Sequence, residues 1–394
     1  YRLVVSVSRP SDESSPHRTP FANSWNFWIY PTADKPAPTN DVLITSAWDD
    51  ATARLSVGGK VLFLPPKADL DWSSPPLDTV PVFWNRLMNP GWSRMLGLWC
   101  DANHPALAGF PTDSHCDWQW TAMIRGVRAI NLSQLSGELR PIVSAIDDWN
   151  RNWKLGVLFE ARVGAGRLLV SSIDVARSTN AVAGQLRRSL LDYMSGEQFQ
   201  PATEISTEQF NGLRFDSRIM KHLGATARAE GTGVESAIDG DPNTYWLVGV
   251  PGRGRDATPP MARPHMLTIS FTNDVAMNGV VLLNRQNDRD RTGDARRYRI
   301  DISNDGTNWT TVLSGDLSST WNPQTLKFDK TVSARQMRFV SLSGYGNDTA
   351  SSLAELAVLY AGPRLATAGG GDIEYQRSRS TSSDVDEGAP RPAN

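Results

Sequence analysis

A short acidic segment holds the residues of this chain that are best suited to metal chemistry. It reads Glu235-Ser-Ala-Ile-Asp239-Gly-Asp241-Pro-Asn-Thr244-Tyr-Trp246, with several carboxylates, a glycine, a proline and a hydroxyl within a few positions. Carboxylate, hydroxyl and backbone carbonyl oxygens are the ligands that a hard cation such as Ca²⁺ prefers. Asp residues in a turn also accept hydrogen bonds from backbone amides without any metal. The segment therefore predicts either a cation-binding loop or a turn that its own Asp side chains cap.

The residues around this segment predict an all-β domain. Short strand-forming runs follow one another, with turn sequences such as Asn304-Asp-Gly306 between them. The expected strands cover residues 265–271, 279–283, 297–303 and 336–342. Many short strands separated by turns are typical of a β-sandwich.

Four separated landmarks give this half a resemblance to the discoidin domain, also called the factor V/VIII C-type or family-32 carbohydrate-binding domain. They are A-x-D-G-D-x-x-T-x-W at 237–246, an arginine after a strand at Arg285, S-x-D-G-x-x-W at 303–309, and a closing Glu355-Leu356. The resemblance covers residues 216–361 and implies a discoidin-type jelly-roll sandwich.

The same resemblance implies a structural Ca²⁺ and a glycan-binding loop end. The metal ligands would be Asp239, Asp241, Thr244, Glu355 and a backbone carbonyl such as that of Ala237. In sugar-binding relatives an aromatic ring stacks on the sugar and polar side chains bind its hydroxyls. The candidate ligand-binding residues are Trp321, Arg285, Asn287, Tyr345 and Asn347. Trp321 is preferred because it lies in a polar loop, whereas the family buries the tryptophans at 246 and 309.

Residues 32–196 predict an α/β domain. A strand at 41–46, a helix at 49–57 that begins at Asp49 or Asp50, and a strand at 60–65 form a β-α-β unit, which indicates a parallel sheet. Gly58-Gly59 would end the helix. Strands at 155–161 and 166–174 are joined by a Gly-rich turn, and residues 180–194 carry apolar residues at helical spacing.

This first half resembles the region that follows the catalytic barrel in bacterial family-2 glycoside hydrolases, the β-galactosidase-like group. Its β/α pattern is also similar to the glutamine-amidotransferase-like domain, with a flavodoxin-like parallel sheet. Active amidotransferases place a Cys on a sharp turn after a strand, but here the strand at 61–64 runs into Pro65-Pro66. The segments that carry the resemblance are 23–31, 97–107, 110–120, 140–149, 164–170 and 186–194.

Other reactive side chains are sparse. Cys100, His104, His115 and Cys116 would be the members of a disulfide, a thiol–imidazole couple or a zinc site. Their spacing matches no standard zinc module, so a buried Cys and hydrogen-bonded His residues are the favoured interpretation. Asp147-Asp148 and Glu160 do not form a convincing glycosidase pair, and no stretch reads as eight βα repeats. No catalytic residue is predicted.

The remaining segments and the bulk composition narrow the function further. Residues 1–31 read as terminal β-strands of a preceding domain or as an entry strand, 197–215 as a polar linker, and 362–394 as a disordered tail. A net charge of −2 does not predict a nucleic-acid partner. No apolar run reaches the length of a membrane span.

Taken together, these features predict the non-catalytic C-terminal part of a bacterial carbohydrate-active enzyme, a β-galactosidase-like glycoside hydrolase. It would bind carbohydrate or polysaccharide and support the preceding catalytic domain of the same polypeptide. The resemblance implies a secreted or periplasmic location. The alternative is a stand-alone carbohydrate- or protein-binding adhesion module without enzyme activity.

Overall fold

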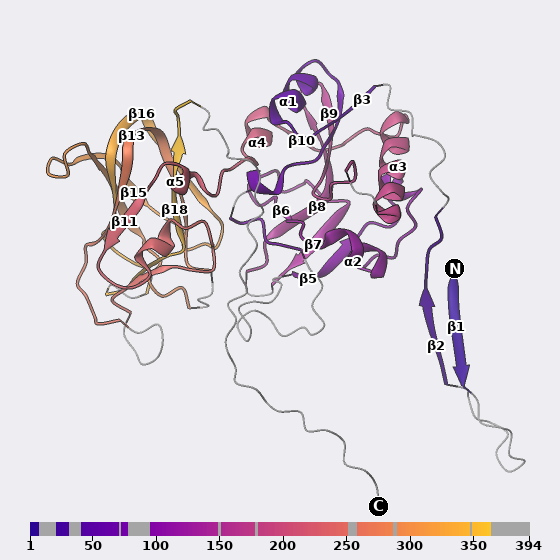
Figure 1. Cartoon of the computed structure of the whole chain (residues 1–394), viewed down its shortest axis with the longest axis horizontal. Helices are drawn as coiled ribbons and strands as arrows, with labels where there is room; N and C mark the ends of the chain where they lie inside the picture. The colour runs from indigo at the N-terminus through magenta and orange to yellow at the C-terminus, as the bar shows by residue number, and fades with distance from the viewer. Residues whose placement is uncertain are drawn as a thin grey trace, which may run out of the picture.

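The computed structural model describes residues 1–7, 21–30, 41–70, 72–77, 95–148, 151–177, 180–250, 258–286, 290–346 and 349–363. Figure 1 shows an α/β domain next to a β-sandwich, with a separate two-stranded hairpin at the N-terminus. The longest described helix has 15 residues, and no described helix is both long and apolar enough to cross a membrane. The predicted tail beyond residue 363 and the loop positions Asn287 and Asn347 lie outside the described residues.

The first domain is built on one mixed sheet, whose strand order is β3-β4-β9-β8-β7-β5. Strands β3, β4 and β9 are parallel, whereas β9, β8, β7 and β5 pair antiparallel. The expectation of a parallel sheet is therefore wrong for half of it. The cause is the turn at Gly164, with φ +58°, because so short a connection joins only antiparallel strands. The strands are β3 (Val42–Thr45), β4 (Lys60–Phe63), β5 (Met95–Cys100), β7 (Val143–Asp147), β8 (Lys154–Val163) and β9 (Gly166–Ser171).

Helices follow the apolar spacing of the sequence. The predicted β-α-β unit is present, with α1 (Trp48–Ser56) between the parallel strands β3 and β4, and Gly58 adopts a left-handed φ of +81° after the helix. The helix begins after Ala47, so the expectation of an Asp N-cap is wrong; both Asp residues lie in the first turn, where their charge favours the helix dipole. Helix α3 (Ala181–Ser195) is capped by Asn180, whose side chain accepts from the amide of Val182 at 2.8 Å.

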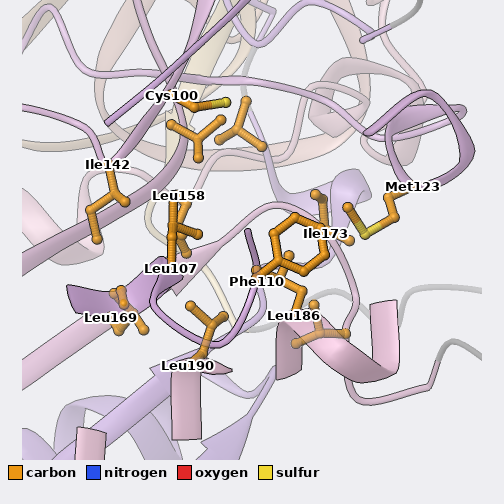
Figure 2. Packing of buried hydrophobic residues seen from close by; sticks show 14 of the residues in the cluster. Cys100, Leu107, Phe110, Met123, Ile142, Leu158, Leu169, Ile173, Leu186 and Leu190 are labelled. Carbon is orange, nitrogen blue, oxygen red and sulfur yellow. The ribbon is translucent and has the colours of Figure 1, made fainter. Parts of the chain in front are cut away.

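Two apolar clusters cover the two faces of this sheet. On one face, α2 (Trp118–Ile124), α3 and the short turn η2 (Pro105–Leu107) pack against the strands. Figure 2 shows Leu107, Phe110, Leu158 and Leu186 of that cluster close together. On the other face, α1 contributes Trp48 and Leu55 to a second cluster. The domain therefore has three layers, with helices on both sides of the sheet.

Residues 197–215 belong to the first domain and are not a linker. Phe199, Ile205 and Phe210 are buried in the two clusters of that domain. Strand β10 (Glu204–Ile205) pairs with β8, as does β6 (Ile130–Asn131), and the short helix α4 (Thr207–Asn211) begins with a reciprocal cap between Ser206 and Gln209. The polar residues of this segment face outward, while these three buried apolar side chains complete the core of the first domain.

The second domain is an antiparallel β-sandwich, as the sequence predicts. Its main sheet has the order β11-β13-β16-β14-β15, β18 also pairs with β13, and β12 pairs with β17. Strand β13 pairs with β11 near its start and with β18 near its end, with register shifts in between that bend it. The elements are α5 (Ile219–His222), β11 (Thr226–Ala229), η3 (Val234–Ala237), β12 (Trp246–Val248), β13 (His265–Leu283), β14 (Arg297–Ser303), β15 (Thr310–Asp316), β16 (Gln324–Ser341), β17 (Ser351–Leu353) and β18 (Glu355–Tyr360).

Two tryptophans join the domains reciprocally. Trp72, which follows the short helix η1 (Lys67–Asp69) of the first domain, is 1% exposed and packs in the core cluster of the second. Its indole Nε1 donates to the backbone oxygen of Ser217 at 3.3 Å, and its ring meets Phe215 edge-on. In return, Trp321 of the second domain packs against the main cluster of the first. Each core thus includes a side chain from its neighbour.

The N-terminal hairpin contrasts with both domains. Strands β1 (Arg2–Val7) and β2 (Phe21–Asn26) pair with each other and, within the described part of the chain, with no other strand. Their apolar side chains are exposed, including Val7 at 67% and Phe21 at 87%. The hairpin is attached through Trp118 of α2, whose Nε1 donates to the backbone oxygen of Asn26 at 2.7 Å.

Replacing Trp72 by alanine tests the reciprocal packing. We expect Trp72→Ala to destabilise the second domain by about 3–5 kcal/mol, the usual cost of removing a buried Trp side chain. Trp118→Ala, which removes a 58% exposed ring, is the matched control. Chemical denaturation followed by circular dichroism measures both variants, and equal small losses in the two would contradict the interlocked arrangement.

Candidate functional site

The acidic turn between η3 and β12 is held by its own side chains. One carboxylate oxygen of Asp239 accepts from the amide of Asp241 at 2.7 Å, and the other accepts from the hydroxyl of Thr244 at 2.8 Å. Asp241 in turn accepts from both the backbone and side-chain nitrogens of Asn243, at 3.0 and 2.6 Å. These bonds are the capped-turn alternative, and they account for the local shape of the loop.

Glu355 is the member of the predicted set that the capped turn does not explain. It is the first residue of β18, opposite Leu283 of β13, and it is 0% exposed. No donor reaches either of its carboxylate oxygens with regular hydrogen-bond geometry, although the carboxyl group of Asp239 and the amide of Gly240 interact with it. Burial raises the pKa of Glu355 well above its usual range, and the nearby carboxylates of Asp239 and Asp241 add to this shift. A buried carboxyl group without regular hydrogen-bond donors is costly unless it binds a proton or a cation.

The structure brings Glu355 to the acidic turn from a strand more than a hundred residues later in the chain. The pKa of Asp239 is also raised, first by desolvation, with Asp241 adding to the effect. Among the described residues no three Asp, Glu, His or Cys side chains form a metal cluster by themselves. A cation here would therefore also need hydroxyl and backbone oxygens, and Thr244 and the buried Ala237 lie in the same loop. This oxygen donor set suits Ca²⁺ chemically.

Arg285 lies just beyond the end of β13 and is held by an aromatic ring. Its guanidinium carbon is 4.2 Å from the centre of the Tyr245 ring, and its Nη2 donates to the Tyr245 hydroxyl at 3.3 Å. The residue is 8% exposed. Tyr245 directly follows Thr244 of the acidic turn, so the turn positions the ring that supports the arginine. Such a cation–π contact fixes the guanidinium donors in one orientation.

Near the end of β13, a buried carboxylate holds the neighbouring loops in place. Asp294 is 1% exposed and accepts from Nε of Arg291 at 2.8 Å and from the Ser319 hydroxyl at 2.9 Å. Asn284 donates to the same carboxylate at 3.3 Å. The network joins the segments that follow β13, precede β14 and follow β15, so it determines where the candidate loops lie.

The remaining predicted ligand residues are placed differently from the expectation. The ring of Trp321, expected to be an exposed stacking surface, packs against the first domain, with the Arg291 guanidinium 4.6 Å from its centre. Tyr345 is half-buried and donates its hydroxyl to the backbone oxygen of Leu317 at 2.6 Å. The structure thus groups Arg285 with the acidic turn but uses Trp321 and Tyr345 in internal packing.

Family models match parts of both domains. The family model "F5/8 type C domain" matches residues 223–356. Residues 223–356 are an F5/8 type C domain. Two curated galactose oxidases from Gibberella zeae are 33% identical over 134 residues, a match that covers 33% of this chain and only 18% of either relative. The model "Domain of unknown function (DUF8487)" matches residues 43–214.

Two of the solved structures that are similar to the F5/8 type C domain come from Clostridium perfringens. One is a family 32 carbohydrate-binding module in complex with GalNAc-β-1,3-galactose, with 25% identity, a TM-score of 0.30, and coverage of 35% of this chain and 96% of that one. Another is the family 32 module of NanJ in complex with galactose, with 26% identity, a TM-score of 0.29, and coverage of 35% and 94%.

Sequence reasoning missed two residues that shape the site of the F5/8 type C domain. The sequence analysis gives Tyr245 no role, yet its ring supports Arg285. Asp294 was not singled out, although it holds three loop residues. The signal for Tyr245 was its position next to the acidic turn, whereas nothing in the local sequence marks Asp294.

The thiols of the first domain are not arranged for catalysis. Cys100 and Cys116 are not joined by a disulfide, and burial raises the pKa of Cys100 to about 12, which disfavours the reactive thiolate. His104 accepts a hydrogen bond from the amide of Ala106 at 3.2 Å and caps η2. Asp147 forms a buried ion pair with Arg151 at 2.5 Å. These side chains have structural partners.

The raised pKa of Glu355 predicts a distinct pH dependence of stability. A carboxyl group whose folded pKa is raised favours folding fully below its unfolded pKa of about 4.3 and loses this contribution as pH rises through the folded pKa. In the presence of a chelator, Glu355→Gln should therefore become increasingly more stable than the wild type as the pH rises above about 4, by about 1.4 kcal/mol for each pH unit until the folded pKa is reached. Denaturant unfolding measures this, with the exposed Glu230→Gln as control. A difference independent of pH would show that Glu355 is ionised in the metal-free fold.

Proposed function

We propose that the F5/8 type C domain binds a galactose-containing glycan at the loops around Arg285. The observation that carries this proposal is the guanidinium held on Tyr245 at the loop end of the sandwich. It is supported by the family-model match and by the 33% identity to a segment of galactose oxidase. A guanidinium is planar and its N–H groups have fixed directions, a geometry that suits recognition of adjacent hydroxyls of one sugar ring.

We also propose a structural Ca²⁺ beneath this rim, with Asp239, Asp241, Thr244, Glu355 and the carbonyl of Ala237 as its ligands. The support is the buried carboxylate of Glu355 beside the acidic turn, which no donor reaches with regular hydrogen-bond geometry. The ion would supply positive charge and hold the turn against β18. Because Tyr245 is part of the same turn, the ion would also steady the ring under Arg285.

The wider role that we propose is that of a non-catalytic accessory region of a secreted or periplasmic bacterial glycoside hydrolase of the β-galactosidase-like group, with an amidotransferase-like first domain. The exposed apolar hairpin β1–β2 supports this, since an isolated two-stranded hairpin is only marginally stable in water and would gain from a further β-domain. The alternative is an adhesion module without an enzyme. Hydrogen exchange of the hairpin amides in the full-length gene product distinguishes them, because only a docked hairpin would be protected.

Replacing Arg285 tests the proposed glycan binding. We expect Arg285→Gln to weaken binding of lactose or N-acetyllactosamine to the whole chain by tenfold or more, measured by titration calorimetry. The control is Arg335→Gln, which removes an exposed arginine paired with Asp274. Unchanged affinity in Arg285→Gln, with thermal stability retained, would rule out the proposed site.

Calcium binding has an independent readout in stability. Adding Ca²⁺ to the chelator-treated chain should raise its unfolding temperature, and the increase should grow with pH because the metal competes with the proton on Glu355. Glu355→Gln should abolish most of the increase, whereas Glu230→Gln should retain it. If Ca²⁺ leaves the wild type unchanged at pH 8, the carboxyl groups share a proton instead, and the metal proposal fails.

A further inference from the structure

A surface pocket lies on the first domain, away from the acidic turn of the second domain. Its volume is about 320 Å³, which is at the lower end of the range for ligand sites. Trp99 of β5 and Ser144 of β7 line it as a cross-strand pair, and Leu139 and Pro141 supply an apolar wall. The arrangement combines an aromatic surface with a hydroxyl on one face of the sheet.

Trp99 is exposed for a reason that the strand geometry makes clear. Its neighbours Leu98 and Cys100 are 2% and 1% exposed and enter the core, so the alternation of the strand directs Trp99 to the opposite face. There the residue is 46% exposed. Gly156 of β8, next to Ser144, is buried beneath Leu132, because a Cβ at that position would lie only 2.7 Å from a side-chain carbon of Leu132.

Two cations border the same pocket without a carboxylate partner in the described part of the chain. Nζ of Lys154 donates to the backbone oxygens of Ser136 and Gly137, both at 3.2 Å, which ties the loop between β6 and β7 to the start of β8. Arg140 is exposed on that loop. Burial lowers the pKa of Lys154, and the like charge of Arg140 lowers it further. Two positive charges held close together favour an anion between them.

We propose that this pocket binds an acidic sugar unit, one that carries a carboxylate or a sulfate. Its ring would stack on Trp99, its anionic group would lie between Arg140 and Lys154, and Ser144 would bind a hydroxyl. The choice of a saccharide, rather than another anion, rests on the glycan-binding function proposed above.

The first domain contains a matched pair of control residues. Trp118 and Arg125 line the other surface pocket, on and just after α2, with the same two side-chain types. The test therefore uses Trp99→Ala and Arg140→Gln against Trp118→Ala and Arg125→Gln, all in the whole chain. Thermal unfolding confirms that each variant is folded.

Titration calorimetry with a tetragalacturonate, its methyl-esterified form and a sulfated galactan oligosaccharide tests the proposal. We expect Trp99→Ala and Arg140→Gln to lose tenfold or more in affinity for one of the two anionic ligands, the controls to bind like the wild type, and the ester to bind weakly. The anion that binds identifies the source of the charge. Added salt should weaken this interaction strongly.

Several outcomes would overturn the proposal. They are equal affinity for the acid and its ester, unchanged binding in both pocket variants, or equally tight binding of inorganic phosphate or ATP. The neutral sugar site is read separately, because Arg285→Gln should impair lactose binding and leave acidic-sugar binding intact. Failure of one site is therefore distinguishable from failure of the other.

Discussion

A carboxylate that the fold has removed from water is the main constraint on the loop end of the second domain. Glu355 starts the last strand, has no exposed surface and has no donor at regular hydrogen-bond geometry for either oxygen. The residues of the acidic turn satisfy one another, so the turn alone does not need a cation. The buried carboxyl group of Glu355 is added to the turn only when the closing strand β18 packs beside it, and this packing requires the whole sandwich to be folded. The fold, the acidic turn and the Tyr245–Arg285 rim are therefore energetically linked.

The packing of Trp72 and Trp321 between the domains restricts which part of the loop end around Arg285 is available to a ligand. Trp321, the residue that sequence reasoning favoured for sugar stacking, packs against the first domain, and Asn322 beside it accepts from Asn131 of β6 at 3.3 Å. A side chain used in this way cannot also offer its face to a ligand. The glycan that we propose for the second domain would therefore bind on the Arg285 side of the loops. The burial of Trp72 in the opposite direction makes the two domains behave as one unit.

Local patterns predicted local structure well and long-range partners poorly. The helix at 181–195 and the β-α-β unit follow from apolar spacing and a left-handed glycine. The mixed sheet was missed because the relative direction of two strands depends on the connection between them. The role of residues 197–215 was missed because the buried apolar residues are scattered among polar ones and gave no periodic signal. The union of Glu355 with the acidic turn came from a family resemblance, since residues so far apart in sequence show no local sign of contact. Trp321 failed because exposure was inferred from its polar neighbours, whereas another domain covers it.

The two surfaces that we propose for ligand binding share one kind of chemistry. They differ from the buried groups of the first domain, where burial raises the pKa of the Cys100 thiol to about 12 and Asp147 is paired with Arg151. In each of the two proposed sites a cation lies beside an aromatic ring: Arg285 lies over Tyr245, and Arg140 lines the same pocket as Trp99. The domains are joined through their cores, which restricts how far the separation of these two surfaces can vary. A polysaccharide long enough to reach both would bind the second surface at high effective concentration, and its affinity would exceed that of either unit alone.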